Sequence, residues 1–243
     1  FPKQYNRRVR KKLFRHLLPL VIITVLSVVV TLPLLRQPDS ALMEDLDGAL
    51  ITWIMTWSAR SLTEHPSQLY NAPILYPLPL TYTFSDPMIS GAILGLPFWL
   101  MTKEPVIFST VNYVLAVWLT GIGSYLLLKD LTNSRGSALA GALLIGFTSL
   151  HFTYYIHLHT FMIQGIPVGL WAWWRFSRSQ HRRWLVLWAG SFLFQTLNSP
   201  LTGYLFLAAH GLYLFDRTSW KMIQKHWRWC LGTILGCGMI MLF

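Results

Sequence analysis

The chain has 243 residues, of which 53% are hydrophobic and only 12% are charged. A soluble domain usually carries about a quarter charged residues, so this composition indicates a polytopic membrane protein and not a large soluble core. The net charge of +11 could suggest a nucleic-acid partner. We exclude nucleic acid, because the basic residues form clusters between apolar runs, as they do in the cytoplasmic loops of membrane proteins.

The N-terminal region predicts the orientation of the chain. Residues 1–16 are rich in Lys and Arg, and residues 17–35 contain no charge. An uncharged run of this length is close to the roughly 20 residues that cross the hydrocarbon core, and a basic flank marks its cytoplasmic end. We therefore predict a cytoplasmic N-terminus at 1–16 and a first span at 17–35. The chain begins without Met and ends in an apolar run, so we interpret it as part of a longer protein.

Residues 36–105 are predicted to form a long outer loop. Within it, residues 48–62 have the pattern of an amphipathic helix lying in the membrane interface. Its expected apolar stripe is Leu50, Trp53, Ile54 and Trp57, and its expected polar stripe is Thr52, Thr56 and Arg60.

Segment 86–101 is apolar enough to be mistaken for a span, and the positions of the basic residues decide its assignment. If it stays on the outer surface as a re-entrant or surface helix, all but three of the 20 Lys and Arg residues lie inside; if it crossed, the positive-inside rule would fail. The further spans, within 106–243, are then predicted at 106–128, 137–156, 160–176, 184–199, 200–215 and 229 onward. The predicted fold class is therefore all-α, a seven-span membrane module with a long outer first loop that bears interfacial helices.

Three carboxylates, Glu44, Asp45 and Asp47, directly follow the first span. Asp47 suits the N-cap of the next helix, but a cap explains one acid and not three. The functional hypothesis makes Asp47 a general base that takes the proton of an acceptor hydroxyl. Asp45 and Glu44 would orient it or bind a metal; their oxygen atoms suit Mg²⁺ or Mn²⁺, although the spacing does not require a metal.

Other candidates lie elsewhere in the predicted outer segments. Asp86 precedes Pro87, which suits a helix N-cap followed by N1, or it faces Asp47 across a cavity as a second carboxylate. His157 and His159 are expected to cap a helix end or to contact a phosphate, and a dedicated metal site is the weaker interpretation. Arg60 is the outer cation that we expect to neutralise a substrate phosphate.

The order of several short motifs resembles that of the GT-C superfamily, membrane glycosyltransferases that take a sugar from a polyprenyl-phosphate donor. These motifs are E-D-L-D-G at 44–48, I-L-Y-P-L-P-L at 74–80 and S-D-P-M-I-S-G-A-I-L-G-L-P at 85–97. The chain looks most like a group of poorly characterised bacterial members, with an acid before a Trp-rich helix at 47–57 and H-L-H-T-F-M-I-Q-G-I-P at 157–167. The resemblance covers nearly the whole chain.

The resemblance implies a hexosyl- or pentosyltransferase in the cell membrane with an extracytoplasmic active site. Asp47 matches the expected base, Asp86 an acid at the start of the outer helix, and His157, Gln164 and Pro167 the pattern of the second outer loop. The implied partners are a polyprenyl-phosphate-linked sugar and a glycan, lipid or protein acceptor. One departure is that this second loop has His157 and His159 where many members place a second acidic motif, which argues against a metal site built from two acidic motifs.

Two other classes of protein remain as alternatives. A secondary transporter would place its acids within spans and show internal repeats, whereas here the acids lie in a loop and no repeat is visible. A non-enzymatic membrane scaffold would tolerate loss of Asp45 and Asp47.

Overall fold

The computed structural model describes residues 17–42 and 46–241, and every regular element within them is helical. The first element of the described part is an apolar helix at Leu17–Val30. The labelled α-helices are α2 (Leu32–Arg36), α3 (Asp47–Glu64), α4 (Ile89–Thr102), α5 (Pro105–Thr132), α6 (Arg135–Gly146), α7 (Ser149–Phe152), α8 (Leu158–Phe161), α9 (Gly165–Ser179), α10 (Arg182–Asn198), α11 (Pro200–Gly211), α12 (Arg217–Lys225) and α13 (Trp227–Met241). Three 3₁₀ turns are η1 (Pro66–Gln68), η2 (Thr81–Phe84) and η3 (Leu212–Phe215). The all-α prediction is confirmed for the described residues.

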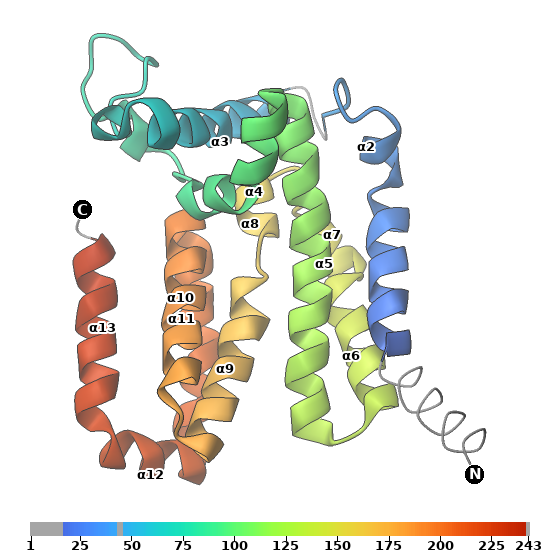
Figure 1. The fold of residues 1–243 in the computed structure, drawn as a ribbon, viewed down its shortest axis with the longest axis vertical. Helices are drawn as coiled ribbons and strands as arrows, with labels where there is room; N and C mark the ends of the chain where they lie inside the picture. The colour runs from blue at the N-terminus through green and yellow to red at the C-terminus, as the bar shows by residue number, and fades with distance from the viewer. Residues whose placement is uncertain (1–16, 43–45, 242–243) are drawn as a thin grey trace, which may run out of the picture.

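The long helix α5 is the centre of the molecule. It packs against α3, α4, α6 and α9, and Figure 1 shows it running the length of the bundle beside the N-terminal helix. Ile23 of that helix packs with Tyr125, Ala138 and Ala142 of α5 and α6. The 28 residues of α5 extend about 42 Å at 1.5 Å per residue.

By length and composition, α5 is the one helix in the described part of the chain that is long and apolar enough to cross a membrane. Three shorter apolar helices accompany it, at Leu17–Val30, Ile89–Thr102 and Arg135–Gly146. The expected span at 106–128 thus corresponds to α5. The complete seven-span arrangement stays a prediction.

The expected helices at 137–156 and 160–176 are not continuous, which corrects the prediction from the sequence. The first ends at Gly146, where the His151 ring lies 2.9 Å from the Gly146 carbonyl oxygen. The second begins only at Gly165, because the Gln195 side chain binds both the Met162 carbonyl and the Gly165 amide. In each place a side chain satisfies backbone groups that helix continuation would otherwise satisfy.

Helices α3 and α4 lie across one end of the bundle (Figure 1). The helix predicted at 48–62 is confirmed as α3, and within its expected apolar stripe Ile54 is buried and Trp53 and Trp57 pack against the core. The buried face extends beyond that stripe. Ile51, Met55 and Ala59 are buried in the core, whereas Leu50 is exposed, and the Thr52 hydroxyl is buried against Ser109. The smaller side chains of this face let α3 pack closely against α4 and α5.

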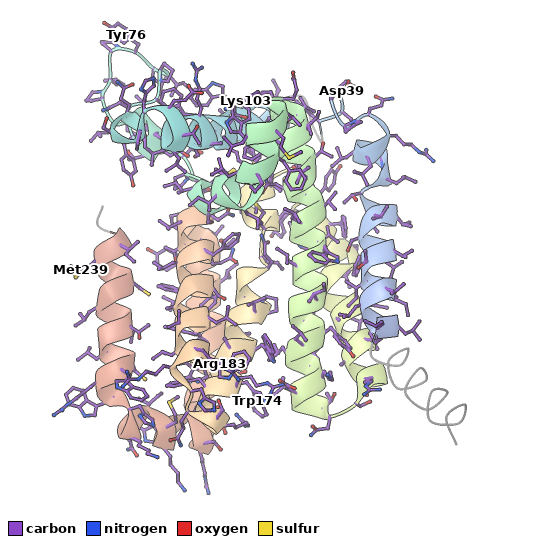
Figure 2. The ribbon with its side chains drawn as sticks, viewed as in Figure 1. Asp39, Tyr76, Lys103, Trp174, Arg183 and Met239 are labelled. Atoms are coloured by element: carbon purple, nitrogen blue, oxygen red, sulfur yellow. The ribbon has the colours of Figure 1, made fainter. Side chains whose placement is uncertain are left out.

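Helices α9, α10, α11 and α13 form a second packed group around Trp173, Trp188 and Phe206. The short helix α12 closes the opposite end of the bundle from α3 (Figure 1). Figure 2 shows the same separation by residue, with Asp39 and Lys103 at the α3 end and Trp174 and Arg183 at the α12 end.

Candidate functional site

The two predicted outer segments meet at two carboxylate–histidine pairs. The Nε2 atom of His157 lies 3.1 Å from Oδ2 of Asp47, and Nε2 of His159 lies 3.3 Å from Oδ2 of Asp86. The two histidine rings contact each other edge to face, with centroids 5.6 Å apart. The four side chains therefore form one cluster, which we call the Asp–His cluster.

The two pairs of the cluster differ in solvent exposure. The side chains of His157 and Asp47 are 44% and 54% exposed, whereas those of His159 and Asp86 are 18% and 27% exposed. A soluble or membrane-borne reactant can therefore reach Asp47, while the second pair sits deeper beneath it. Two carboxylates in different environments can serve different roles in one reaction.

Neither aspartate caps a helix, so the capping interpretation of both is wrong. Helix α3 takes Leu46 as its N-cap residue, and the carboxylate of Asp47 faces His157 instead. Helix α4 begins at Ile89, with Met88 as its N-cap residue. The Met88 amide donates to the Asn198 carbonyl oxygen at 3.1 Å, which holds residues 86–88 outside the helix and leaves Asp86 available to His159.

Asn198 fixes the deeper pair from both sides. Its Nδ2 atom donates to the His159 carbonyl oxygen at 2.7 Å, and its own carbonyl accepts from Met88. Pro87, next to Asp86, is held through its carbonyl, which accepts hydrogen bonds from the hydroxyls of Ser58 and Tyr82. Asn198 is fully buried, and its only signal in the sequence is an Asn-Ser-Pro turn between two apolar runs.

Burial lowers the pKa of His159 from its ordinary value; Asp86 opposes this shift, and the neighbouring His157 adds to it. The imidazole is therefore neutral at neutral pH. The Nε2 atom of His159 faces Asp86, and a neutral imidazole ring has one N–H donor and one acceptor nitrogen. This pair can hold or move a proton without carrying a permanent positive charge.

The remaining predicted residues do not join the Asp–His cluster. Arg60 forms an ion pair with Glu64 at 2.8 Å and is 62% exposed, and it lies thirteen residues along α3 from Asp47, a distance of about 20 Å. Gln164 is buried, and neither of its amide atoms has a hydrogen-bond partner within the described part of the chain. Glu44 and Asp45 lie outside the described residues.

No metal site accompanies the cluster in the portion of the chain described. Among residues 17–42 and 46–241, no three His, Cys, Asp or Glu side chains are grouped to hold a metal ion. The Asp47–His157 and Asp86–His159 contacts are direct hydrogen-bond or ion-pair contacts between the side chains themselves. They use the same atoms that metal ligation would need.

An apolar groove of about 610 Å³ adjoins the cluster through the segment 154–160. Tyr154 and Thr160 line the groove, and the Thr160 hydroxyl donates to the His157 carbonyl oxygen at 2.9 Å. The other lining residues come from α6, α11 and the connection between them: Leu144, Ile145, Thr148, His151, Ile163, Leu201, Thr202 and Leu205. Thr160 therefore connects the groove to the segment that bears the two histidines.

Comparison of the chain with protein-family models, with curated proteins and with solved structures gives no match.

Proposed function

We propose that the chain is the catalytic module of a membrane glycosyltransferase that moves a sugar from a polyprenyl-phosphate donor to an acceptor hydroxyl. The observation that supports this proposal most strongly is the Asp–His cluster, which joins Asp47 and Asp86 of one predicted outer segment to His157 and His159 of the next. Three of these four residues, Asp47, Asp86 and His157, are positions that the resemblance to the GT-C superfamily selects. They meet although the chain separates them by 110 positions in the case of Asp47 and His157.

In the proposed reaction, Asp47 accepts the proton of the acceptor hydroxyl. The acceptor oxygen forms a bond to the anomeric carbon while the bond from that carbon to the donor phosphate oxygen breaks, with inversion. The leaving group is polyprenyl phosphate, which departs beside His157 and His159. The transition state has oxocarbenium character, which a nearby carboxylate stabilises.

The apolar groove supports a lipid-linked donor. Leucine and isoleucine side chains form half of its lining, and Tyr154 and Thr160 lie on the segment that also bears the two histidines. A polyprenyl chain would occupy the groove with its phosphate directed to the cluster. In this proposal the histidines, and not Arg60, lie beside the donor phosphate, because the Arg60 guanidinium forms an ion pair with Glu64.

The distribution of charge supports a multi-pass protein in the cell membrane with a cytoplasmic N-terminus and the cluster on the outer face. The α12 end of the bundle bears Arg183 and Trp174, and the α3 end bears Asp39 (Figure 2). Basic residues favour the cytoplasmic side and aromatic residues the membrane interface. The seven spans belong to this proposal.

A transfer assay with membranes containing the full-length protein and a panel of radiolabelled polyprenyl-phosphate sugars tests the proposal. The variants are Asp47→Asn and, as a matched control, Asp39→Asn, which removes an acid whose side chain contacts only Ser40 among the described residues. We expect transfer by the wild type and by Asp39→Asn, and loss of transfer in Asp47→Asn at equal expression. Transfer that survives in Asp47→Asn would exclude Asp47 as the base, and no transfer with any donor would favour a transporter or scaffold.

A further inference from the structure

At the opposite end of the bundle from the Asp–His cluster, two adjoining hollows lie along α12. One has a volume of about 480 Å³ and is lined by Phe215, Trp220 and Gln224 together with Arg217 and Lys221. The other has a volume of about 300 Å³ and extends past Lys225 towards the C-terminal end of α9. Arg217 and Lys221 line both hollows, so these two cations stand at their common boundary.

The charge at this boundary is uncompensated. No acidic side chain lines either hollow, and neither Arg217 nor Lys221 has a carboxylate partner in the described portion of the chain. Asp216, the acid that precedes Arg217, caps α12 by accepting hydrogen bonds from the Thr218 and Ser219 amides. The same carboxylate lies 3.8 Å from the guanidinium of Arg178.

The spacing of the cations on α12 places them on one face. Arg217, Lys221 and Lys225 follow one another at intervals of four residues, which on a helix gives a single stripe. Lys225 donates to Gln180 at 2.8 Å, which leaves Arg217 and Lys221 as the pair that can meet an external anion. Arg and Lys together bind a phosphate well, because Arg offers a fork of donors and Lys a mobile point charge.

Exposed aromatic side chains border the same cations. Phe215 is 87% exposed and Trp220 is 50% exposed, and both line the larger hollow. Aromatic rings beside cations on a short helix that lies across the end of the bundle (Figure 1) are typical of the membrane interface. A soluble anion would gain nothing from these rings, whereas a lipid would place its glycerol and acyl chains against them.

We propose that this surface, formed by Phe215, Arg217, Trp220 and Lys221, binds the phosphate headgroup of an anionic glycerophospholipid. Arg217 and Lys221 contact the phosphate, and Phe215 and Trp220 pack against the upper part of the acyl chains. The site lies at the far end of the bundle from the Asp–His cluster, and it does not depend on the sugar-transfer function.

Native mass spectrometry of the full-length protein in detergent tests the proposal. Phosphatidylglycerol and phosphatidylcholine with the same acyl chains are added at equal concentration, and the retained lipid is counted for the wild type and for R217Q/K221Q. The control is K129Q/R183Q, which removes two charges of the same sign whose side chains line neither hollow. Unchanged thermal unfolding of both double variants shows that each is folded.

We expect the wild type and K129Q/R183Q to prefer phosphatidylglycerol equally, and R217Q/K221Q to lose about fivefold in this preference for each cation removed. W220Q, which changes no charge, should also retain less phosphatidylglycerol. An unchanged preference in R217Q/K221Q would overturn the proposal, and so would an equal loss in the control. Displacement of the lipid by inorganic phosphate at the same concentration would identify a soluble-anion site and also overturn it.

Discussion

The Nε2 atom of His157 lies 3.1 Å from the Oδ2 atom of Asp47. This contact joins the start of α3 to the residue that precedes α8. Because the deeper Asp86–His159 pair repeats the same arrangement beside it, the two outer segments cannot shift relative to each other without breaking both pairs. The relative position of these segments is therefore part of the proposed site.

The stability of the protein should depend on the protonation of His159. Burial lowers the pKa of this residue in the folded state, so the unfolded chain takes up a proton first as the pH falls. Stability attributable to His159 is then fully present above its ordinary pKa of about 6.5 and decreases below it. We expect the Tm of the wild type to fall more between pH 7.5 and 5.5 than that of His159→Gln, whose amide can still donate to Asp86 but does not titrate. The same pH dependence in both proteins would contradict this account of His159.

The Asn198 side chain should contribute both to the free energy of unfolding and to transfer activity. Asn198→Ala removes the hydrogen bond to the His159 carbonyl and leaves this carbonyl unpaired, at a cost of about 1–3 kcal/mol in the free energy of unfolding. Transfer activity should fall as well, because the variant loses the side-chain bond that positions His159 in the deeper pair. Denaturant unfolding and transfer assays measure the two effects.

A suitable control for Asn198 is Ser124→Ala. The Ser124 hydroxyl is also fully buried but has no hydrogen-bond partner among the described residues, so its removal should leave stability unchanged or slightly higher. An Asn198→Ala protein as stable as this control would show that the bond to His159 is unimportant.

The apolar groove should control donor binding and not the chemical step. Leu205 lines the groove from α11, and Leu205→Trp should fill it. We expect KM for the polyprenyl-linked donor to rise by roughly tenfold with little change in kcat, as for the loss of an interaction made equally in the ground state and the transition state. The control is Val186→Trp, at an exposed apolar position that does not line the groove. This variant should leave KM and kcat unchanged. An equal rise in KM for both variants would place the lipid elsewhere.

The sequence predicted the helical class and the position of α3, because these depend on local patterns of apolar and charged residues. It did not predict the break between α8 and α9, which depends on the Gln195 side chain binding Met162 and Gly165 about 30 positions away. The buried face of α3 was predicted only in part, with Ile54 but without Met55 and Ala59. That face is chosen by packing against α4 and α5, which admits Met55 and Ala59 and leaves Leu50 exposed.

The candidate site shows the same division between local and long-range information. Asp47, Asp86, His157 and His159 could be identified from residue type and motif order. Their grouping in pairs could not, because it depends on Asn198 holding two distant segments together. Arg60 was expected beside the acids, but its helical position directs it to Glu64 at i+4.

A double-mutant cycle on sugar transfer tests the central claim most directly. kcat/KM would be measured for the wild type, Asp47→Asn, His157→Gln and the double variant, with Asp39→Asn as a control for loss of an outer acid. If Asp47 acts as the base and His157 acts with it, Asp47→Asn should lose about a hundredfold to ten-thousandfold, and the double variant should lose hardly more than Asp47→Asn alone. Losses that multiply in the double variant, or no loss in Asp47→Asn, would contradict the account.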